Sequence, residues 1–348
     1  MSPYLPPLMW LSMLTGTLLT MSSSHWFPAW AGLELATLAI VPLMLRHHHP
    51  RRVEATTKYF LVQAFASALL LFAILSSAWL SGEYYLNSMH HPFPCSLMLI
   101  ALSIKLGLAP FHTWVPDVLQ GLDLSAGLIL STWQKIAPMS LLLQMAFVPF
   151  NLALFIGLTS ILIGAWGGLN QTQTRKLMAF SSTAQGGWII IAVIIDPLMA
   201  LFAFALYLTM TSCAFMILLY NSATSVARLT STWSFTPAMT AIAPMVFLSL
   251  GGLPPLTGFS MKWAVMFTLV AEGYPLASLF AALFSLLGLF FYLRICYAFA
   301  LTSSPSPLTA TPCWRTSRRF WPLPLTFAIV AATCLLPIFP SVLTLPYF

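Results

Sequence analysis

Residues 58–80 read KYFLVQAFASALLLFAILSSAWL, and no charged residue follows Lys58 in this stretch. An α-helix needs about 20 predominantly apolar residues to cross a bilayer. In the whole chain, 6% of the residues are charged and 59% are hydrophobic, whereas about 25% of the residues in a soluble domain are charged. Lipid must therefore be the solvent for most of the chain. Continuous apolar runs favour helices over a barrel, whose strands alternate. The sequence predicts an all-α polytopic membrane protein.

Similar runs along the chain predict about eleven transmembrane helices. Their ranges are 5–22, 27–45, 58–80, 95–110, 124–145, 150–169, 177–195, 198–220, 237–271 with a break inside it, 276–299 and 322–343. The segments between them are short and rich in Pro, Ser, Asn and Gly, as turns are. We expect one membrane domain over residues 1–348.

The charged residues outside the predicted spans are distributed unevenly between the two sides of the membrane. Eleven spans place the termini on opposite sides, and we call the N-terminal one side A. Side A receives the basic residues Arg46, Arg51, Arg52, Lys58, Arg175, Lys176, Arg228, Arg315, Arg318 and Arg319, with Arg294 close to it. Side B receives Glu83, Asp196 and Glu272 and no Lys or Arg. The acidic exceptions on side A are Glu54, Asp117 and Asp123. Because basic loops stay in the compartment of synthesis, this segregation supports both the count and the orientation.

Four ionisable residues fall inside predicted spans: Glu34, Lys105, Lys135 and Lys262. A charge at mid-bilayer costs at least about 2.5–3.5 kcal/mol on insertion scales, so such residues face protein or water and often mark a transport path. Burial favours the neutral forms, which brings proton exchange nearer to neutral pH. The alternative is a set of static ion pairs that hold helices together. One acid and three bases on four helices favour proton movement, because a single pair cannot account for all of them.

Two of the lysines adjoin predicted helix breaks. Pro and Gly interrupt residues 105–117, which begin with Lys105, and residues 251–258, just before Lys262. Irregular backbone at membrane depth is tolerated only inside protein or beside a water-filled cavity. Pro138, three residues after Lys135, predicts a kink there.

The two breaks also occupy matching places. Each break lies in the fourth helix of a five-helix unit. This predicts two inverted repeats over residues 1–146 and 147–300, followed by a loop and a C-terminal helix over 301–348. Matched interrupted helices in inverted halves are typical of ion-conducting cores. The alternative is that two Pro- and Gly-rich breaks coincide by chance.

A few other residues are candidates for a functional or structural role. His112 lies inside the first break, where a hydrogen-bonding role and a proton-relay role are both open. His47, His48 and His49 resemble a metal tract, but they adjoin Pro50 in a basic loop and favour a solvated structural role. The five cysteines contain no CxxC pair, so we expect neither an iron–sulfur cluster nor a structural zinc. Trp residues near span ends suggest an interfacial belt: Trp26, Trp30, Trp79, Trp114 and Trp321.

Several motifs resemble a known family. They are residues 105–117, residues 167–188, residues 249–263, and residues 27–42 with Gly32-Leu33-Glu34. They resemble the antiporter-like subunits in the membrane arm of respiratory complex I, the mitochondrial NADH:ubiquinone oxidoreductase, and in particular its animal chain 2 members. The resemblance covers essentially the whole chain.

The resemblance implies roles for matching residues. Glu34 and Lys105 would be a coupling pair, Lys135 the central protonatable residue and Lys262 a residue near the exit, with His112 and waters between them. Gln185 stands where family members usually have a histidine in a Ser-Ser-x-x-His-x-Gly-Trp pattern. Gln185 cannot titrate, so a proton step at that histidine is in doubt here, although glutamine could hold a water.

The resemblance also implies the setting. The chain would lie in the mitochondrial inner membrane with side A in the matrix, and would hold no cofactor itself. FMN, the iron–sulfur clusters and ubiquinone would belong to other complex I subunits. Its partners would be neighbouring antiporter-like and small membrane-arm subunits and membrane lipids including cardiolipin, with no nucleic acid.

Two other functions remain open from the sequence. A freestanding cation/proton antiporter could use the same fold and lysines, and would move protons with sodium or potassium when reconstituted alone. A purely structural scaffold would lose assembly, and not proton flux, when Lys135 or Lys262 is replaced. The short loops and the lack of a soluble domain favour a subunit packed among others.

Overall fold

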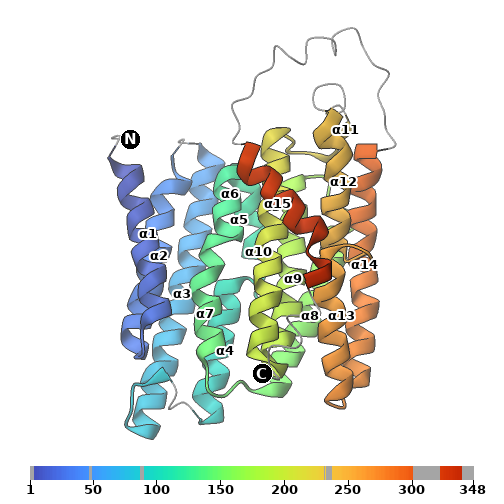
Figure 1. Cartoon of the computed structure of the whole chain (residues 1–348). Coiled ribbons are helices and arrows are strands. Elements are labelled where there is room, and N and C mark those ends of the chain that lie inside the picture. The colour runs from blue at the N-terminus through green and yellow to red at the C-terminus, as the bar shows by residue number, and fades with distance from the viewer. Residues whose placement is uncertain are drawn as a thin grey trace. The chain divides into compact units, whose positions relative to one another are not determined.

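The structure is a computed structural model of the chain, and it describes residues 4–46, 49–86, 90–230, 232, 237–300 and 322–338. These residues form helices joined by short turns (Figure 1), and their only β-type pairing is two isolated bridges, His25 with Tyr85 and Gln173 with Ser225. The all-α prediction is therefore confirmed for the described part. His47, His48, Trp321, the 301–321 loop with its three arginines, and the end of the last predicted helix lie outside the described residues.

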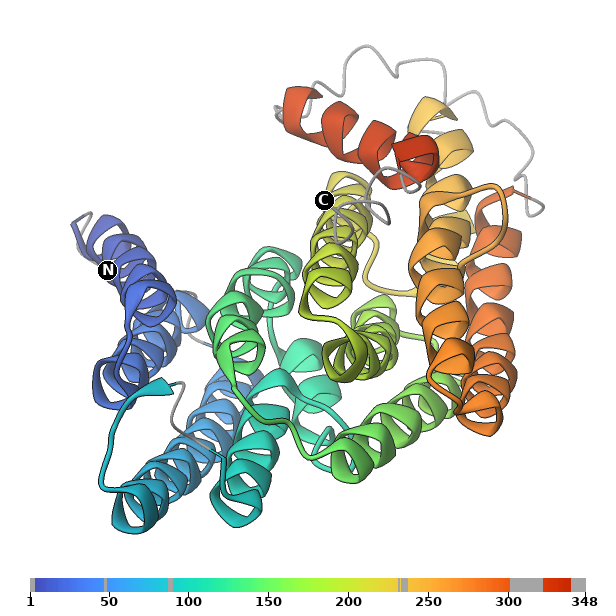
Figure 2. The same cartoon turned by 60° about the horizontal axis from the view of Figure 1, so that its bottom comes forward.

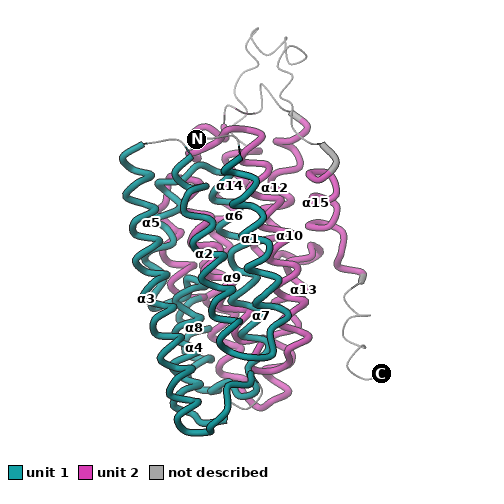
Figure 3. Tube along the Cα trace, turned by 90° about the vertical axis from the view of Figure 1, so that its left-hand side faces the viewer, with its two compact units in different colours: residues 1–160 teal, residues 161–348 magenta. Residues whose placement is uncertain are grey.

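The chain divides into two compact units, residues 1–160 and residues 161–348 (Figure 3). Six helices are long and apolar enough to cross a membrane: α2, α3, α8, α9, α10 and α14. The chain is thus a multi-pass helical membrane protein.

Unit 1 holds seven α-helices, one short 3-10 helix and the first part of α8 within its described residues. They are α1 (Leu5–Ser22), α2 (Trp26–Met44), α3 (Pro50–Ser81), α4 (Pro92–Leu106), α5 (Trp114–Gly121), α6 (Leu124–Ser131), η2 (Trp133–Lys135), α7 (Ile136–Gln144) and α8 (Phe150–Gly168), which continues into unit 2. α1 packs on α2, α2 on α3, α3 on α4 and α5, and α7 on α1, α2 and α4. Glycines permit the first of these contacts, because a Cβ on Gly16 would lie 2.8 Å from the carbonyl oxygen of Gly32.

Unit 2 holds the remaining described helices. They are α9 (Thr174–Ile195), α10 (Pro197–Tyr220), α11 (Val226–Thr230), α12 (Pro237–Gly251), α13 (Thr257–Ala271), α14 (Pro275–Ala300), α15 (Pro322–Cys334) and η6 (Leu336–Ile338). α10 contacts α9, α12, α13 and α15, and α14 contacts α12 and α13. Figure 2 shows α13 and α14, both orange, side by side.

The observed helices differ from the predicted spans in two informative places. α3 begins at Pro50 rather than near Lys58, because the His49 side chain accepts a hydrogen bond from the Arg51 N–H and Pro50 suits a first helical turn. The predicted helix over 124–145 is divided by η2. Pro138 has no N–H to offer the carbonyl of Gln134, and the chain tightens to i to i+3 hydrogen bonds at Lys135 and Ile136. The expected kink is therefore a 3-10 interruption at Lys135 itself.

Candidate functional site

The first part of the site is a buried ion pair between α2 and α4. Lys105 Nζ lies 3.5 Å from Glu34 Oε1, and the two side chains are 1% and 23% exposed. Lys105 stands in the last turn of α4, where a cation is favoured by the negative end of the helix dipole. The structure thus brings together two residues that are 71 positions apart in the chain.

The predicted break after Lys105 is present, and its local cause is visible. Gly107 has φ +75°, a left-handed conformation that favours glycine. The N–H groups of Gly107 and Leu108 donate to the carbonyls of Ile104 and Ser103, which is a Schellman cap. His112 lies in the irregular stretch that follows, half-buried and hydrogen-bonded to the Pro110 backbone.

Two further residues close this break, and the sequence did not reveal either. The indole Nε1 of Trp114 donates to the Ile104 carbonyl at 3.1 Å, and the Ala109 N–H donates to Ser160 Oγ at 3.0 Å. The prediction that Trp114 belongs to an interfacial belt is wrong, because it is 7% exposed and caps a broken helix. Trp26 is fully buried as well, whereas Trp79 is 90% exposed.

Lys135 is the third predicted residue of unit 1. It is 7% exposed and ends η2, directly before α7, which packs on α4 and α2. Its neighbour Gln134 donates from Nε2 to the Ala36 carbonyl of α2 at 3.1 Å, which ties the interruption to the helix that carries Glu34. α7, which follows Lys135 directly, therefore packs on the helices that carry Glu34 and Lys105 within unit 1.

Lys262 stands at the second break, in unit 2. α12 ends at Gly251, Gly252 has φ +77°, and the N–H groups of Gly252 and Leu253 donate to Ser249 and Leu248. Lys262 Nζ donates to the Gly251 carbonyl at 2.7 Å. The lysine stem lies over Gly252, since a Cβ there would be 2.8 Å from Lys262 Cδ. The lysine is thus held against the open end of α12.

A largely apolar pocket of about 350 Å³ borders this lysine. Its walls come from the second break and from the facing sides of α13 and α14, including Phe259, Met266 and Leu286. Lys262 is the one charged residue among the residues lining it. The amine therefore lies between the polar end of a helix and an apolar space.

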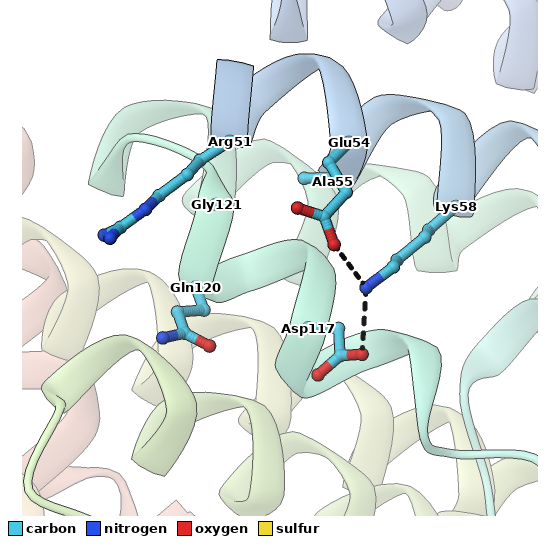
Figure 4. A pocket seen from close by; sticks show the side chains of 7 residues that line it. All are labelled: Arg51, Glu54, Ala55, Lys58, Asp117, Gln120 and Gly121. Carbon is cyan, nitrogen blue, oxygen red and sulfur yellow. Dashed lines mark ion pairs between the residues drawn. The ribbon is translucent and has the colours of Figure 1, made fainter. Parts of the chain in front are cut away.

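A separate polar pocket of about 300 Å³ lies between the start of α3 and α5 (Figure 4). Lys58 lies between two acids, 2.8 Å from Glu54 Oε1 and 3.5 Å from Asp117 Oδ2. The Arg52 guanidinium donates to Asp123 at 2.5 Å. The three acids that were exceptions on side A are thus each paired with a base of that side. The Lys58–Asp117 and Arg52–Asp123 pairs fasten the segment after the first break onto α3.

The chain holds ionisable groups at interrupted helices within a multi-pass helical bundle. This arrangement defines its class, the ion-translocating membrane proteins with discontinuous helices. Two family models cover nearly all of the chain: the NADH:quinone oxidoreductase/Mrp antiporter transmembrane model matches residues 23–288, and the NADH dehydrogenase subunit 2 C-terminus model matches residues 289–343. The chain belongs to the NADH dehydrogenase subunit 2 members of this family.

Curated relatives agree with this assignment. The chain is 51% identical over 345 residues to NADH-ubiquinone oxidoreductase chain 2 of Gadus morhua and 50% identical over 346 residues to that of Danio rerio, and each comparison covers 99% of both chains.

Two solved structures share the fold. A chain of respiratory complex I from Thermus thermophilus with bound aureothin has a TM-score of 0.86 and 25% identity, over 99% of this chain and 80% of that one. A chain of the Mrp complex from Dietzia sp. DQ12-45-1b has a TM-score of 0.78 and 19% identity, over 84% and 60%. The Mrp likeness shows the fold alone.

Proposed function

We propose that the chain is a core membrane subunit of respiratory complex I that translocates protons across the mitochondrial inner membrane. NADH oxidation and ubiquinone reduction elsewhere in the complex drive this movement. The full-length relatives named NADH-ubiquinone oxidoreductase chain 2 support membership of the complex. The observation that carries the protonmotive role is the buried contact between Glu34 and Lys105 beside a broken helix.

The mechanism follows from how this pair controls its surroundings. While Glu34 and Lys105 are close, the lysine charge is compensated and Lys135 can hold a proton. When they separate, the Lys105 charge repels the proton on Lys135. Two like charges about 10 Å apart at an effective dielectric of about 20 repel by about 1.7 kcal/mol, a more than tenfold change in proton occupancy. His112 and water serve as relays, and Lys262 receives the proton near the exit.

The test is Lys135→Met in reconstituted complex driven by NADH, at matched assembly. We expect the number of protons pumped per electron pair to fall, because methionine fills the site without a proton. Lys176→Met, a lysine at the loop end of α9, is the control and should pump like the wild type. Wild-type pumping by Lys135→Met would make the buried charges structural and move the proton path to another chain.

The alternative functions give different results. A freestanding antiporter would show sodium- or potassium-dependent proton movement when the chain is reconstituted alone, and we expect none. A scaffold would show impaired assembly in Lys135→Met but normal pumping in the complexes that do assemble.

The eleven-span topology is part of the proposal. The six long helices would be joined by α1, by α15, and by three interrupted spans built from α4 with α5, from α6, η2 and α7, and from α12 with α13. The two repeats over 1–146 and 147–300 are supported by their breaks. Both read Gly-Leu-x-Pro, and their glycines Gly107 and Gly252 have φ +75° and +77° in identical caps.

The same proposal covers orientation, partners and cofactors. Side A would face the matrix. The outward faces of α3 and α14, which expose Leu61, Phe65 and Leu286, would contact membrane lipids including cardiolipin and neighbouring antiporter-like and small subunits. FMN, iron–sulfur clusters and ubiquinone would be held by other subunits.

A further inference from the structure

The polar pocket between the start of α3 and α5 has two ends of opposite charge (Figure 4). At one end, Lys58 bridges Glu54 and Asp117, so a single cation stands between two carboxylates. At the other end lies Arg51, whose side chain extends away from this trio. Arg51 takes part in none of the ion pairs found between the described residues. The pocket therefore presents a surplus negative charge at one end and a surplus positive charge at the other.

Small residues leave the hollow between these two ends. Ala55 on α3 and Gly121 on α5 face each other, since a Cβ on Gly121 would lie 2.6 Å from the Ala55 Cβ and 2.8 Å from the Arg51 carbonyl oxygen. The two helices thus touch at this point, and neither small residue has a side chain long enough to fill the space beside the charged groups. A volume of about 300 Å³ stays open there.

The length of α3 carries the pocket beyond the hydrocarbon of the membrane. The 32 residues of α3 span about 48 Å at 1.5 Å per residue, whereas the hydrocarbon core is about 30 Å thick. The apolar run of α3 begins after Lys58, and Arg51 lies seven residues earlier, which is about 10 Å farther along the helix. The headgroup layer adds only about 5–7 Å on each side, so Arg51 reaches the aqueous space on predicted side A.

The order of the charges favours a protein over a lipid as the occupant. A phospholipid holds its phosphate next to the glycerol, so a headgroup site needs its surplus cation at the membrane end. Here the end nearest the membrane has the surplus of acid, and the surplus cation is remote from it.

This chain has no acid of its own left for Arg51 on that side. The three acids predicted for side A, Glu54, Asp117 and Asp123, are already paired with Lys58 or Arg52. The 301–321 loop contains three arginines and no acid. A complement to Arg51 must therefore come from another chain.

We propose that this pocket is the docking site for a polypeptide segment of another subunit on side A, which presents a carboxylate to Arg51 and a lysine or arginine to Glu54 and Asp117. The two charges of the segment stand about 10 Å apart, which is two turns of a helix or three residues of extended chain. This inference rests on the proposed function, because it takes the chain to be a subunit of the complex with side A facing the matrix.

The test measures how fast a thiol in the pocket is labelled in the intact complex. Gln120→Cys places the thiol among the lining residues, and an impermeant maleimide reaches side A in inside-out vesicles. Adding Arg51→Glu reverses the cationic end, so the segment should leave and the labelling rate should rise at least fivefold. The local electrostatic effect has the opposite sign, because a new negative charge beside a thiol disfavours the reactive thiolate.

Two further variants serve as controls in the Gln120→Cys background. Arg228→Glu makes the same charge change at an exposed arginine of predicted side A in unit 2, and it should leave the labelling rate unchanged. Arg51→Lys keeps the positive charge and should keep the thiol protected. Equal rates in the Arg51→Glu and Arg228→Glu variants would show a solvated pocket and overturn the proposal. Protection that disappears when lipid is exchanged for detergent, with all subunits retained, would identify a headgroup and overturn it as well.

This result is separable from the test of proton pumping, since neither Arg51 nor Gln120 belongs to the proposed proton path. If Lys135→Met fails to pump and the two arginine-to-glutamate variants are labelled equally, only the docking site is wrong. If Lys135→Met pumps normally and Arg51→Glu uncovers the pocket, the docking site stands and the protonmotive role fails.

Discussion

At the scale of single residues, a cation deep in an apolar bundle needs a compensating group. Lys105 has Glu34 at 3.5 Å, and Lys262 has the Gly251 carbonyl at 2.7 Å. The first partner carries a charge that can be withdrawn by a small movement, while the second is backbone at a helix end. We therefore propose the Glu34–Lys105 pair as the contact that switches, whereas Lys262 is hydrogen-bonded to the backbone at the end of α12.

We predict that Glu34→Gln uncouples the complex. Amide and carboxylate have the same shape, but the amide cannot compensate the Lys105 charge, and a close pair in a partly buried site is worth on the order of a few kcal/mol. We expect at least a tenfold fall in the rate of proton pumping, measured in proteoliposomes with NADH. Glu83→Gln, an exposed acid after α3, is the control and should pump normally. Unchanged pumping in Glu34→Gln would exclude the switch.

At the scale of elements, the interruptions are built by residues that cannot continue a helix and by the side chains that take up the freed carbonyls. Gly107 and Gly252 have the left-handed conformation, and Trp114, Gln185 and Lys262 supply donors to the ends of α4 and α12. Each break therefore has a defined geometry. α5 is held on α3 partly by small residues, since a Cβ on Gly121 would lie 2.6 Å from the Ala55 Cβ.

We predict that Gly252→Ala impairs pumping more than its backbone strain explains. An alanine with positive φ costs roughly 1–2 kcal/mol, and here its Cβ would also lie 2.9 Å from Lys262 Nζ and displace it. Gly82→Ala is the matched control, because Gly82 has φ +75° and nothing within 4 Å of an added Cβ. The measurement compares protons pumped per electron pair at matched assembly. Equal results for the two variants would show that the position of Lys262 does not matter.

At the scale of the whole molecule, the distribution of charge is the basis of the proposed orientation. Basic residues cluster in the loops predicted for side A, and the acids assigned to the same side form ion pairs with Lys58 and Arg52. These exposed pairs contribute little to stability, about 0–1 kcal/mol each. The acids assigned to side A do not oppose the proposed orientation, because the positive-inside rule depends on Lys and Arg and acidic residues contribute little to it.

We predict that thiol labelling will separate the two sides. Cysteines introduced at Asn170, on side A, and at Glu83, on side B, lie in exposed turns. An impermeant maleimide should label Glu83→Cys in mitoplasts and Asn170→Cys in inside-out vesicles. The wild-type chain provides the background, because three of its cysteines are buried. Labelling of both positions from one side would contradict the proposed topology.

The amino-acid sequence by itself determined the class of fold, the places of the two breaks, the three buried lysines and the partly buried Glu34. These depend on local or summed properties: apolar runs too long for a soluble protein, Gly and Pro that cannot continue a helix, and charges inside those runs. The same reasoning placed Lys135 near an interruption but expected a kink, because Pro138 does not show how many hydrogen bonds the preceding turn will lose.

Only the tertiary structure decided which groups meet. Glu34 and Lys105 are 71 residues apart, Gln185 and Leu250 are 65 apart, and Ala109 and Ser160 are 51 apart. No local pattern specifies such contacts, because they depend on which faces of the packed helices are turned toward each other. Trp114 shows the same limit: its type and place near a span end suggest the membrane interface, but packing turned its indole inward to the open end of α4. The sequence therefore contains the chemical groups of the site, and helix packing makes them neighbours.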